Sequence, residues 1–162
     1  MKIRVLFVCL GNICRSPAAE GLMRHFVKGA NLEDIIFCDS AGTAAYHSGE
    51  RADIRMRRQA SDRGYNLNSI SRKIKSPDDF YKFDYIIGMD NENISDIENV
   101  CPDINSMSKI YKMVDFCEEG KYTKVPDPYY GGVEGFEFVI DVLEDACKGL
   151  LKHLREKYKL EP

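Results

Sequence analysis

The feature that most constrains the fold of this chain is a short apolar run close to its first residue. Residues Ile3 to Val8 are β-branched, aromatic or leucine, apart from Arg4. A run of this length and composition is typical of a strand buried on both faces, as in a parallel sheet covered by helices. We therefore expect helices on both sides of a sheet that contains this strand.

Further apolar runs alternate with segments of helical spacing. Strands are predicted at 35–38, 85–89 and 110–114, and helices from residue 16, over 50–63, from about residue 91 and after residue 132. Ser16 is the predicted N-cap of the first helix, with Pro17 as its first residue. The alternation predicts an α/β domain with a parallel sheet. No linker or repeat divides the chain, so residues 1–162 are interpreted as a single domain.

Ligands of such sheets bind beyond the carboxyl ends of the strands. This rule places the candidate site at the segments that follow the predicted strands, which are 9–16, 39–43, 89–90 and the loop around residue 127.

The composition excludes several classes of function. The chain has 23 basic and 26 acidic residues, a net charge of -3, so there is no basic excess to neutralise a nucleic-acid strand. No apolar run approaches the ~20 residues needed to span a membrane. The six cysteines form no C-x-x-C pair and the histidines do not cluster beside them, which argues against a structural metal. We expect reduced thiols and a cytoplasmic location, without nucleic-acid or membrane partners.

The segment Cys9–Ser16 runs from a strand end into a helix start. If the intervening loop curls, its backbone N–H groups and the helix N-terminus converge on one anion. Gly11 and Asn12 tolerate the left-handed backbone that a tight loop needs, and Arg15 offers a planar fork for two phosphate oxygens. The same positive environment favours the nucleophilic thiolate of Cys9. The alternative interpretation is a buried cysteine followed by an ordinary helix cap.

A second candidate element is the segment 125–132, in which Asp127 lies between two prolines. The prolines leave its backbone little freedom, and a rigid carboxylate beside the aromatic rings of Tyr129 and Tyr130 suits a general acid. The alternative is a plain turn, for which Pro-Asp-Pro is a common sequence.

These two elements carry a resemblance to a known family. Residues 8–17 resemble the phosphate-binding loop of the low-molecular-weight protein tyrosine phosphatases, and residues 127–130 resemble their general-acid loop. Segments 39–42 and 83–90 also match, in the expected order, so the resemblance covers essentially the whole chain. It implies a three-layer, Rossmann-like α/β domain with a four-stranded parallel sheet flanked by helices on both faces.

The resemblance also implies a mechanism. Cys9 would form a phosphocysteine intermediate, and Arg15 would bind the phosphoryl group and stabilise the transition state. Asp127 would protonate the leaving phenol and then activate water. The implied phosphate-binding residues are Leu10, Gly11, Asn12, Ile13, Cys14 and Arg15. No metal or other cofactor is implied; the partners would be phosphotyrosine-containing proteins or peptides, with inorganic phosphate as a product inhibitor.

Supporting roles follow from the same resemblance. Ser16 would hydrogen-bond the Cys9 sulfur, and Asn12 and Ser40 would brace the loop. Cys14 resembles a second cysteine that can form a reversible disulfide with the nucleophile under oxidation, a means of redox regulation; the alternative is a packed thiol.

The expected walls of the substrate pocket are Ile13, Tyr46, Tyr129 and Tyr130. Ile13 stands where relatives that act on phosphoarginine tend to carry threonine, which favours phosphotyrosine. Tyr46 and Tyr129 are expected to face each other and to stack on an aryl phosphate. The alternative for Tyr46 is an ordinary tyrosine of a surface loop.

One departure from the family concerns the support of Asn12. Many relatives carry a histidine where this chain has Ser69, three residues before Arg72, so the way in which Asn12 is held stays open. The histidines of this chain, His47 among them, are interpreted as ordinary helix or loop residues. The charged run 51–58 is interpreted as a solvated helix face.

Two other functions are alternatives to the phosphatase. An arsenate reductase on the same scaffold would need further cysteines to pass a disulfide outward. Relatives of that kind carry a cysteine pair in the segment that follows the third strand, where this chain has the single Cys101. A non-catalytic phosphate-binding module is the other alternative, against which the joint presence of Cys9, Arg15 and Asp127 argues.

Overall fold

The strand predicted at the start of the chain is an inner strand of the sheet. The computed structural model describes residues 1–129 and 131–160. The strands are β1 (Ile3–Cys9), β2 (Ile36–Gly42), β3 (Tyr85–Gly88) and β4 (Ile110–Lys112). Their order in the sheet is β2-β1-β3-β4, and all three neighbouring pairs are parallel. The predicted four-stranded parallel sheet is therefore confirmed.

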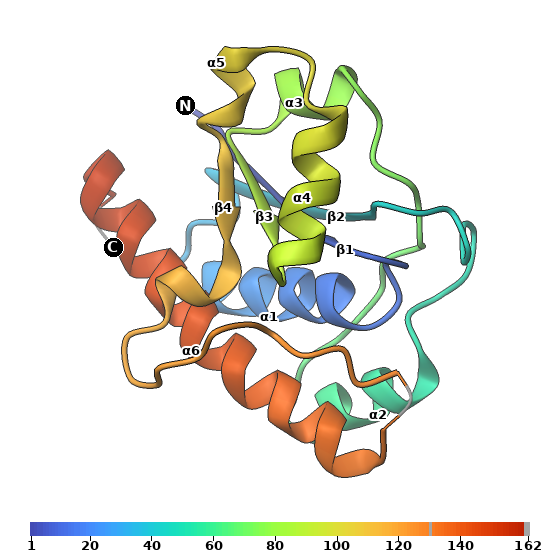
Figure 1. Ribbon diagram of the computed structural model, residues 1–162. Coiled ribbons are helices and arrows are strands. Elements are labelled where there is room, and N and C mark those ends of the chain that lie inside the picture. Colours follow the sequence, from blue (N-terminus) through green and yellow to red (C-terminus); the bar gives the residue numbers. More distant parts are fainter. Residues whose placement is uncertain (130, 161–162) are drawn as a thin grey trace.

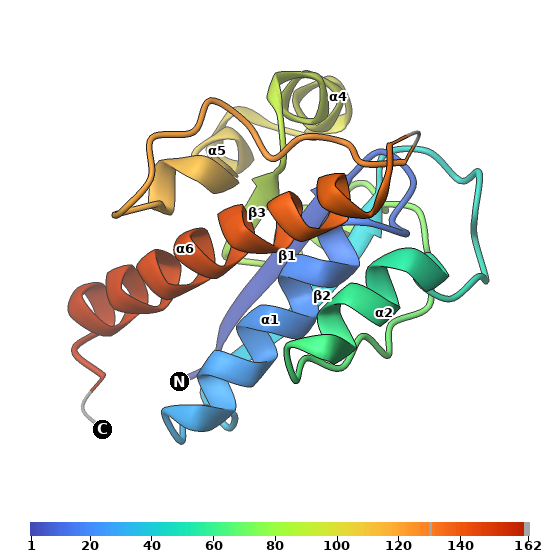
Figure 2. The ribbon, with the colours of Figure 1, turned by 90° about the horizontal axis from the view of Figure 1, so that it is seen from below.

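Helices cover both faces of this sheet, so the predicted three-layer arrangement is also confirmed. The helices are α1 (Arg15–Gly29), α2 (Ile54–Asp62), α3 (Asp78–Lys82), α4 (Asn91–Val100), α5 (Ile104–Met107), the 3-10 helix η1 (Met113–Phe116) and α6 (Val133–Tyr158). Figure 1 shows α1 and α6 on one side of the sheet and α3 and α4 on the other. Figure 2 shows α2 beside α1, on the same side as α6.

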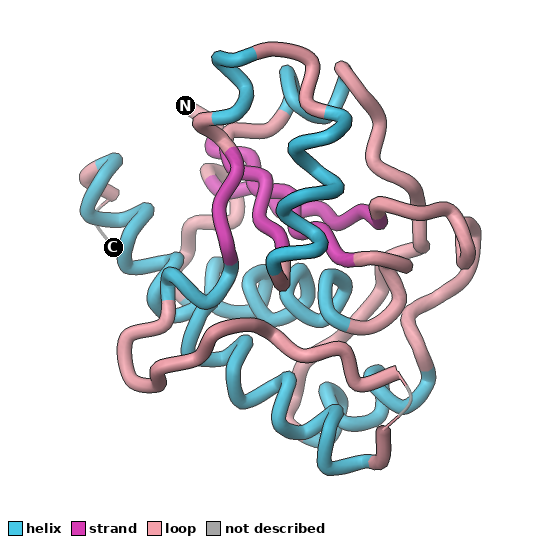
Figure 3. The backbone as a smooth tube through the Cα atoms, in the orientation of Figure 1, coloured by secondary structure: helices cyan, strands magenta, loops and turns pink. Residues whose placement is uncertain are grey.

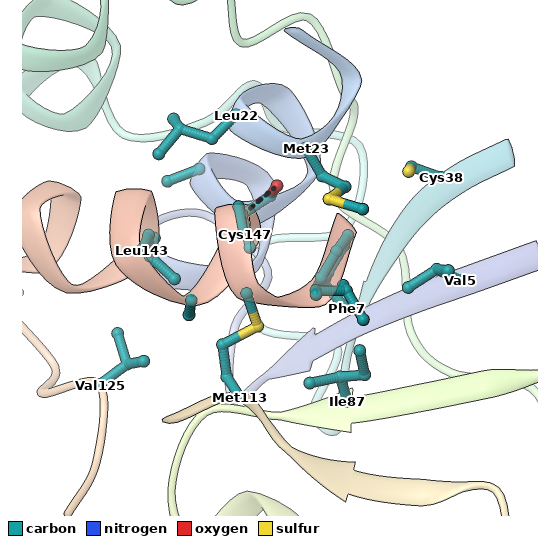
Figure 4. Packing of buried hydrophobic residues seen from close by; sticks show 14 of the residues in the cluster. Val5, Phe7, Leu22, Met23, Cys38, Ile87, Met113, Val125, Leu143 and Cys147 are labelled. Atoms are coloured by element: carbon teal, nitrogen blue, oxygen red, sulfur yellow. Dashed lines mark hydrogen bonds between the residues drawn. The ribbon is translucent and has the colours of Figure 1, made fainter. Parts of the chain in front are cut away.

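The first strand is buried on both faces, which explains its unbroken apolar pattern. Val5 and Phe7 belong to a large cluster with α1 and α6, whereas Leu6 and Val8 belong to a second cluster with α3 and α4. All four side chains are inaccessible to solvent, and full burial of such a side chain contributes roughly 1.5–3 kcal/mol. Figure 4 shows the first cluster, in which the Cys147 thiol donates to the backbone oxygen of Ala19 in α1.

The predicted start of the first helix is wrong by two residues. The N-cap is Cys14, whose carbonyl accepts the N–H of Ala18 at 3.2 Å, and the helix begins at Arg15. Ser16 is the second helical residue and is fully buried. Its hydroxyl is directed into the preceding loop rather than onto the helix end, so it cannot act as the N-cap. Pro17 is tolerated because N–H groups of the first turn have no partner inside the helix.

Several other boundaries differ from the prediction. β2 continues to Gly42, because residues 39–42 pair with the end of β1. The second helix begins at Ile54, capped by Asp53, rather than at residue 50. The fourth strand ends at Lys112 and continues as η1. The short helices α3 and α5 were not predicted, since four or five residues carry too little periodic signal.

The carboxyl ends of β1, β2 and β3 meet at one edge of the sheet, and the segments that follow them are loops or helix starts (Figure 3). Gly42 makes the close approach of the segments that follow β1 and β2 possible. A Cβ at this position would lie 2.8 Å from the Leu10 carbonyl oxygen and 2.9 Å from that of Ala44. The long loop between η1 and α6 brings a third segment to this edge, because the N–H of Val125 donates to the Met89 carbonyl at 2.9 Å.

Within the described residues, no helix combines the length and apolar character needed to cross a membrane.

Candidate active site

The loop between β1 and α1 is held in a tight curve around Asn12. This residue has a left-handed backbone with φ of 56° and is almost fully buried. Its side-chain nitrogen donates to the Ser16 hydroxyl at 2.8 Å, and its side-chain oxygen accepts the backbone N–H of Arg72 at 3.0 Å. The predicted bracing role of Asn12 therefore has a geometric basis, and a backbone N–H supplies the support that stayed open without the histidine.

Cys9 ends β1 with its thiol beside Ser16. The distance between the Cys9 Sγ and the Ser16 Oγ is 3.0 Å, as the interpretation of Ser16 requires. The Ser16 oxygen already accepts a hydrogen bond from Asn12, and its own proton has the Cys9 sulfur at 3.0 Å as a nearer acceptor than the Ala41 carbonyl at 3.5 Å. A hydroxyl that donates to sulfur stabilises a thiolate.

Arg15 is a buried cation with acceptors from three segments. The residue is 3% exposed. Its Nη1 donates to the Asp90 carboxylate at 2.6 Å and to the Val125 carbonyl at 3.1 Å, and its Nη2 lies 3.8 Å from Asp127. Burial opposes the charge, but the negative charges of Cys9, Asp90 and Asp127 outweigh it and raise the pKa of Arg15. The guanidinium is therefore permanently charged and fixed at the loop.

Asp127 reaches the site from the loop that precedes α6. Its side chain is 46% exposed, and its Oδ1 accepts the backbone N–H of Tyr129 at 3.1 Å. This hydrogen bond forms the turn that was predicted as an alternative role. The turn does not exclude the other role, because the Asp127 carboxylate also lies near the Arg15 guanidinium.

The predicted residues surround one pocket of about 160 Å³. Its lining residues are Cys9, Leu10, Gly11, Ile13, Cys14, Arg15, Tyr46, His47, Asp127 and Tyr129. Asn12 and Ser16 lie behind this lining, and Tyr130 lies outside the described residues. Tyr46 is at the mouth and is 74% exposed.

His47 is a pocket residue that the sequence interpretation missed. Its Nδ1 lies 3.1 Å from the Glu50 carboxylate, and its ring centroid lies 6.1 Å from that of Tyr129. A Cβ on Gly11 would lie 3.1 Å from the imidazole, so a side chain there would push the ring away. Of the loop residues near Tyr129, His47 makes the ring contact that was expected of Tyr46.

Arg55 corrects the interpretation of the charged run 51–58. Its guanidinium makes two hydrogen bonds with Asp53, at 2.8 and 3.0 Å. It also lies over the rings of Tyr129 and Phe136, with centroid distances of 5.3 and 4.7 Å. Arg51 and Arg58 are exposed, as expected of a solvated face, whereas Arg55 is only partly solvated, with a side chain 41% exposed. The contacts of Arg55 were missed because the rings come from a segment distant in sequence.

Cys14 and Ser40 are placed differently from each other. Cys14 lines the pocket, and burial raises the pKa of its thiol, with Asp53 and Cys9 adding to the effect. The Ser40 hydroxyl donates to Glu20 of α1 at 2.6 Å rather than to the loop. Ser40 therefore joins β2 to α1, and this contact of its hydroxyl does not support the expected direct bracing of the loop.

The part of the chain that the structure describes contains no group of three or more His, Cys, Asp or Glu side chains placed to hold a metal ion.

Comparison with known proteins identifies the family. The model of the family "Low molecular weight phosphotyrosine protein phosphatase" matches residues 4–160. A phosphatase of that name from Schizosaccharomyces pombe is 42% identical over 156 residues, which are 94% of this chain and 97% of the relative. The chain therefore belongs to the low molecular weight phosphotyrosine protein phosphatases, which are hydrolases.

Solved structures agree with this assignment. A protein tyrosine phosphatase from Entamoeba histolytica superposes with a TM-score of 0.93 at 53% identity, covering 98% of this chain and all of the other. The Drosophila arginine phosphatase superposes with a TM-score of 0.86 at 33% identity over the full length of both chains. The fold is thus shared by one relative that is named a tyrosine phosphatase and another that is named an arginine phosphatase.

Proposed function

We propose that this protein hydrolyses phosphotyrosine through a phosphocysteine intermediate. The observation that carries the proposal is the meeting of the Cys9 thiol, the Arg15 guanidinium and the Asp127 carboxylate at one small pocket. These three groups supply a nucleophile, a phosphoryl-binding cation and a proton donor, which together suffice for the reaction.

In the first step, the phosphoryl group lies against the loop and accepts hydrogen bonds from Arg15. The Cys9 thiolate attacks phosphorus, the bond from phosphorus to the phenolic oxygen breaks, and Asp127 gives its proton to that oxygen. The Ser16 hydroxyl, 3.0 Å from the sulfur, holds the thiolate in position before attack. Arg15 is already fixed by Asp90, so little reorganisation is needed when charge develops on the phosphoryl oxygens.

In the second step, Asp127 accepts a proton from a water molecule that attacks the phosphocysteine. The bond from phosphorus to sulfur breaks, and inorganic phosphate and the Cys9 thiolate are released. Phosphate remains a ligand of the same loop, so we expect it to inhibit competitively.

Phosphotyrosine is favoured by the walls of the pocket. Ile13, 8% exposed, presents an apolar surface, and His47 and Tyr129 add rings beside the entrance. An aryl group gains from such contacts, whereas a phosphoarginine guanidinium would lose hydrogen bonds to water against Ile13. A phosphotyrosine peptide should therefore be hydrolysed faster than the matched phosphoarginine peptide, and Ile13→Thr should narrow the difference.

The proposal is tested with an aryl phosphate at mildly acidic pH in the presence of EDTA. Cys9→Ser should abolish turnover while phosphate or vanadate still binds, because the loop and Arg15 remain. Cys101→Ser is a matched control, since this thiol lies away from the pocket and should be dispensable. Residual activity of Cys9→Ser within about tenfold of wild type would exclude Cys9 as the nucleophile.

The same experiment separates the other functions. Wild-type protein that binds phosphate but hydrolyses neither substrate would be a non-catalytic module. Arsenate reduction coupled to thiols would support the reductase. The cytoplasmic location stays a prediction, supported by six thiols that are all free.

A further inference from the structure

Several carbonyl groups of the phosphate loop are held by donors from neighbouring segments. Cys9 and Leu10 accept the N–H groups of Thr43 and Ala44, at 2.9 and 3.0 Å. The Ile13 carbonyl accepts the N–H of Asp53 at 2.7 Å. In a trans peptide the carbonyl and the following N–H point in opposite directions. A donor that holds the carbonyl on one side therefore directs the next N–H to the other.

Gly11 is the exception in this set, because its carbonyl is held by a side chain. The Ser71 hydroxyl donates to the Gly11 oxygen at 3.0 Å. Of the contacts to loop carbonyls that the structure describes, the others come from backbone N–H groups, which substitution leaves in place. The Gly11–Asn12 peptide is thus the one whose orientation depends on the identity of a residue outside the loop.

Ser71 is itself fixed. It is 5% exposed, its N–H donates to the Glu50 carbonyl at 2.8 Å, and its carbonyl accepts the N–H of Gly49 at 2.9 Å. The next residue, Arg72, holds the Asn12 side chain by its N–H, and its guanidinium binds Asp79 at 2.9 Å. The segment 71–72 therefore contacts two successive residues of the loop from a rigid support.

We propose that Ser71 is a positioning residue for phosphate binding, which orients the Gly11–Asn12 peptide so that the Asn12 N–H is presented to the phosphoryl group. The proposal rests on the proposed function for its catalytic consequence, but not for its consequence on anion binding. Ser71 does not touch the substrate; it acts through the peptide that does.

The experiment measures binding of inorganic phosphate to wild type, Ser71→Ala and Ser71→Thr by ¹⁵N NMR and calorimetry. A hydrogen bond of about 0.5–1.5 kcal/mol corresponds to a change of roughly 2- to 13-fold in affinity. We expect Ser71→Ala to bind phosphate at least twofold more weakly and Ser71→Thr, which keeps the hydroxyl, to restore binding. The phosphate-induced shift of the Asn12 amide should shrink in Ser71→Ala, while that of the Leu10 amide is retained.

Ser108→Ala is the matched control, because the Ser108 hydroxyl also donates to a backbone carbonyl, that of Asn105, at 2.8 Å. It lies after α5, at the other end of β4 from the site, so phosphate affinity should equal that of wild type. A change of less than twofold in Ser71→Ala, or an equal change in Ser108→Ala, would overturn the proposal. If the threonine variant does not fold, the Asn12 amide shift in Ser71→Ala decides.

Failure of this inference is distinguishable from failure of the proposed function. If wild type binds phosphate but does not hydrolyse aryl phosphates, the binding comparison still tests Ser71. If wild type hydrolyses them and Ser71→Ala retains both its phosphate affinity and its KM, the inference fails while the proposed function stands.

Discussion

Asp90 is expected to control activity through Arg15, although it also has a structural role. Its Oδ2 accepts a hydrogen bond from the Arg15 Nη1 at 2.6 Å, and its Oδ1 accepts the N–H of Asn93 in the first turn of α4 at 2.8 Å. Asp90→Ala removes both contacts. Asp90→Asn leaves one acceptor oxygen, which can serve one of the two contacts but not both.

The expected loss of activity in Asp90→Ala follows from the burial of Arg15. At 3% exposure, water can replace the lost acceptor poorly. A hydrogen bond to a charged group contributes about 1.5–3 kcal/mol, and each 1.36 kcal/mol is about tenfold in rate. We expect kcat/KM of Asp90→Ala to fall roughly 10- to 150-fold. The Val125 carbonyl still accepts from the same nitrogen at 3.1 Å, which favours the lower half of that range.

Steady-state kinetics with an aryl phosphate, together with urea unfolding, tests this prediction. Asp103→Ala is the control for the helix cap, because Asp103 accepts the N–H of Ser106 at 2.8 Å as the N-cap of α5. Asp103→Ala should lose about 0.5–2 kcal/mol in the free energy of unfolding, and Asp90→Ala should lose more, because it also leaves the buried Arg15 without its carboxylate partner, but activity should fall in Asp90→Ala alone. A fall below threefold in Asp90→Ala, or an equal fall in Asp103→Ala, would refute the role of Asp90 in holding Arg15.

Four further outcomes are expected. Arg15→Lys should be nearly as harmful to kcat/KM as Arg15→Ala, because lysine keeps the charge but loses the two-pronged geometry; a nearly normal lysine variant would contradict this. Asp127→Asn should slow hydrolysis by ~10²–10⁴-fold for a phenol that leaves poorly and less for a very acidic phenol; equal losses across phenols would make Asp127 a turn residue. Peroxide should inactivate the enzyme reversibly by oxidising Cys9 to a sulfenic acid, which the Cys14 thiol converts to a disulfide with loss of water. A sulfinic acid on Cys9 together with a free Cys14 thiol, found by mass spectrometry, would exclude this route. Burial raises the pKa of Glu20, so the folded state binds the Glu20 proton more tightly than the unfolded chain does. This stabilisation is lost as the pH rises above about 4 through the raised pKa. Glu20→Gln should flatten the measured dependence of unfolding free energy on pH, and an unchanged slope would show that Glu20 is not the source of this dependence.

The sequence was sufficient to predict which side chains meet at the candidate site where the residues are close together in the chain. The loop from Cys9 to Arg15 follows a strand and precedes a helix, so its curvature and its charge could be inferred from local rules. Asp127 could be found because two prolines mark its loop. The place of Asp90 followed from the rule that parallel strands present their carboxyl ends at one edge, but its contact with Arg15 did not.

The parts that escaped prediction depend on contacts between distant segments. His47 entered the pocket because the loop after β2 passes over Gly11, which no local pattern signals. Arg55 was read as solvated since its aromatic neighbours lie far along the chain. Ser16 was read as a helix cap because serine before proline usually is one, whereas here Asn12 and Cys9 draw its hydroxyl into the loop.

Val125 shows how the loop of the proposed proton donor, Asp127, is tied to Arg15. Its N–H donates to the Met89 carbonyl at the end of β3, its carbonyl accepts from Arg15, and its side chain is fully buried. The acid loop is therefore anchored two residues before Asp127, on the guanidinium that would bind the phosphoryl group. Because Arg15 is held in turn by Asp90, a displacement of the guanidinium should also displace Asp127. The activity of Asp90 variants should thus depend more steeply on the leaving group, as in Asp127→Asn, an effect that a purely electrostatic role for Asp90 would not produce.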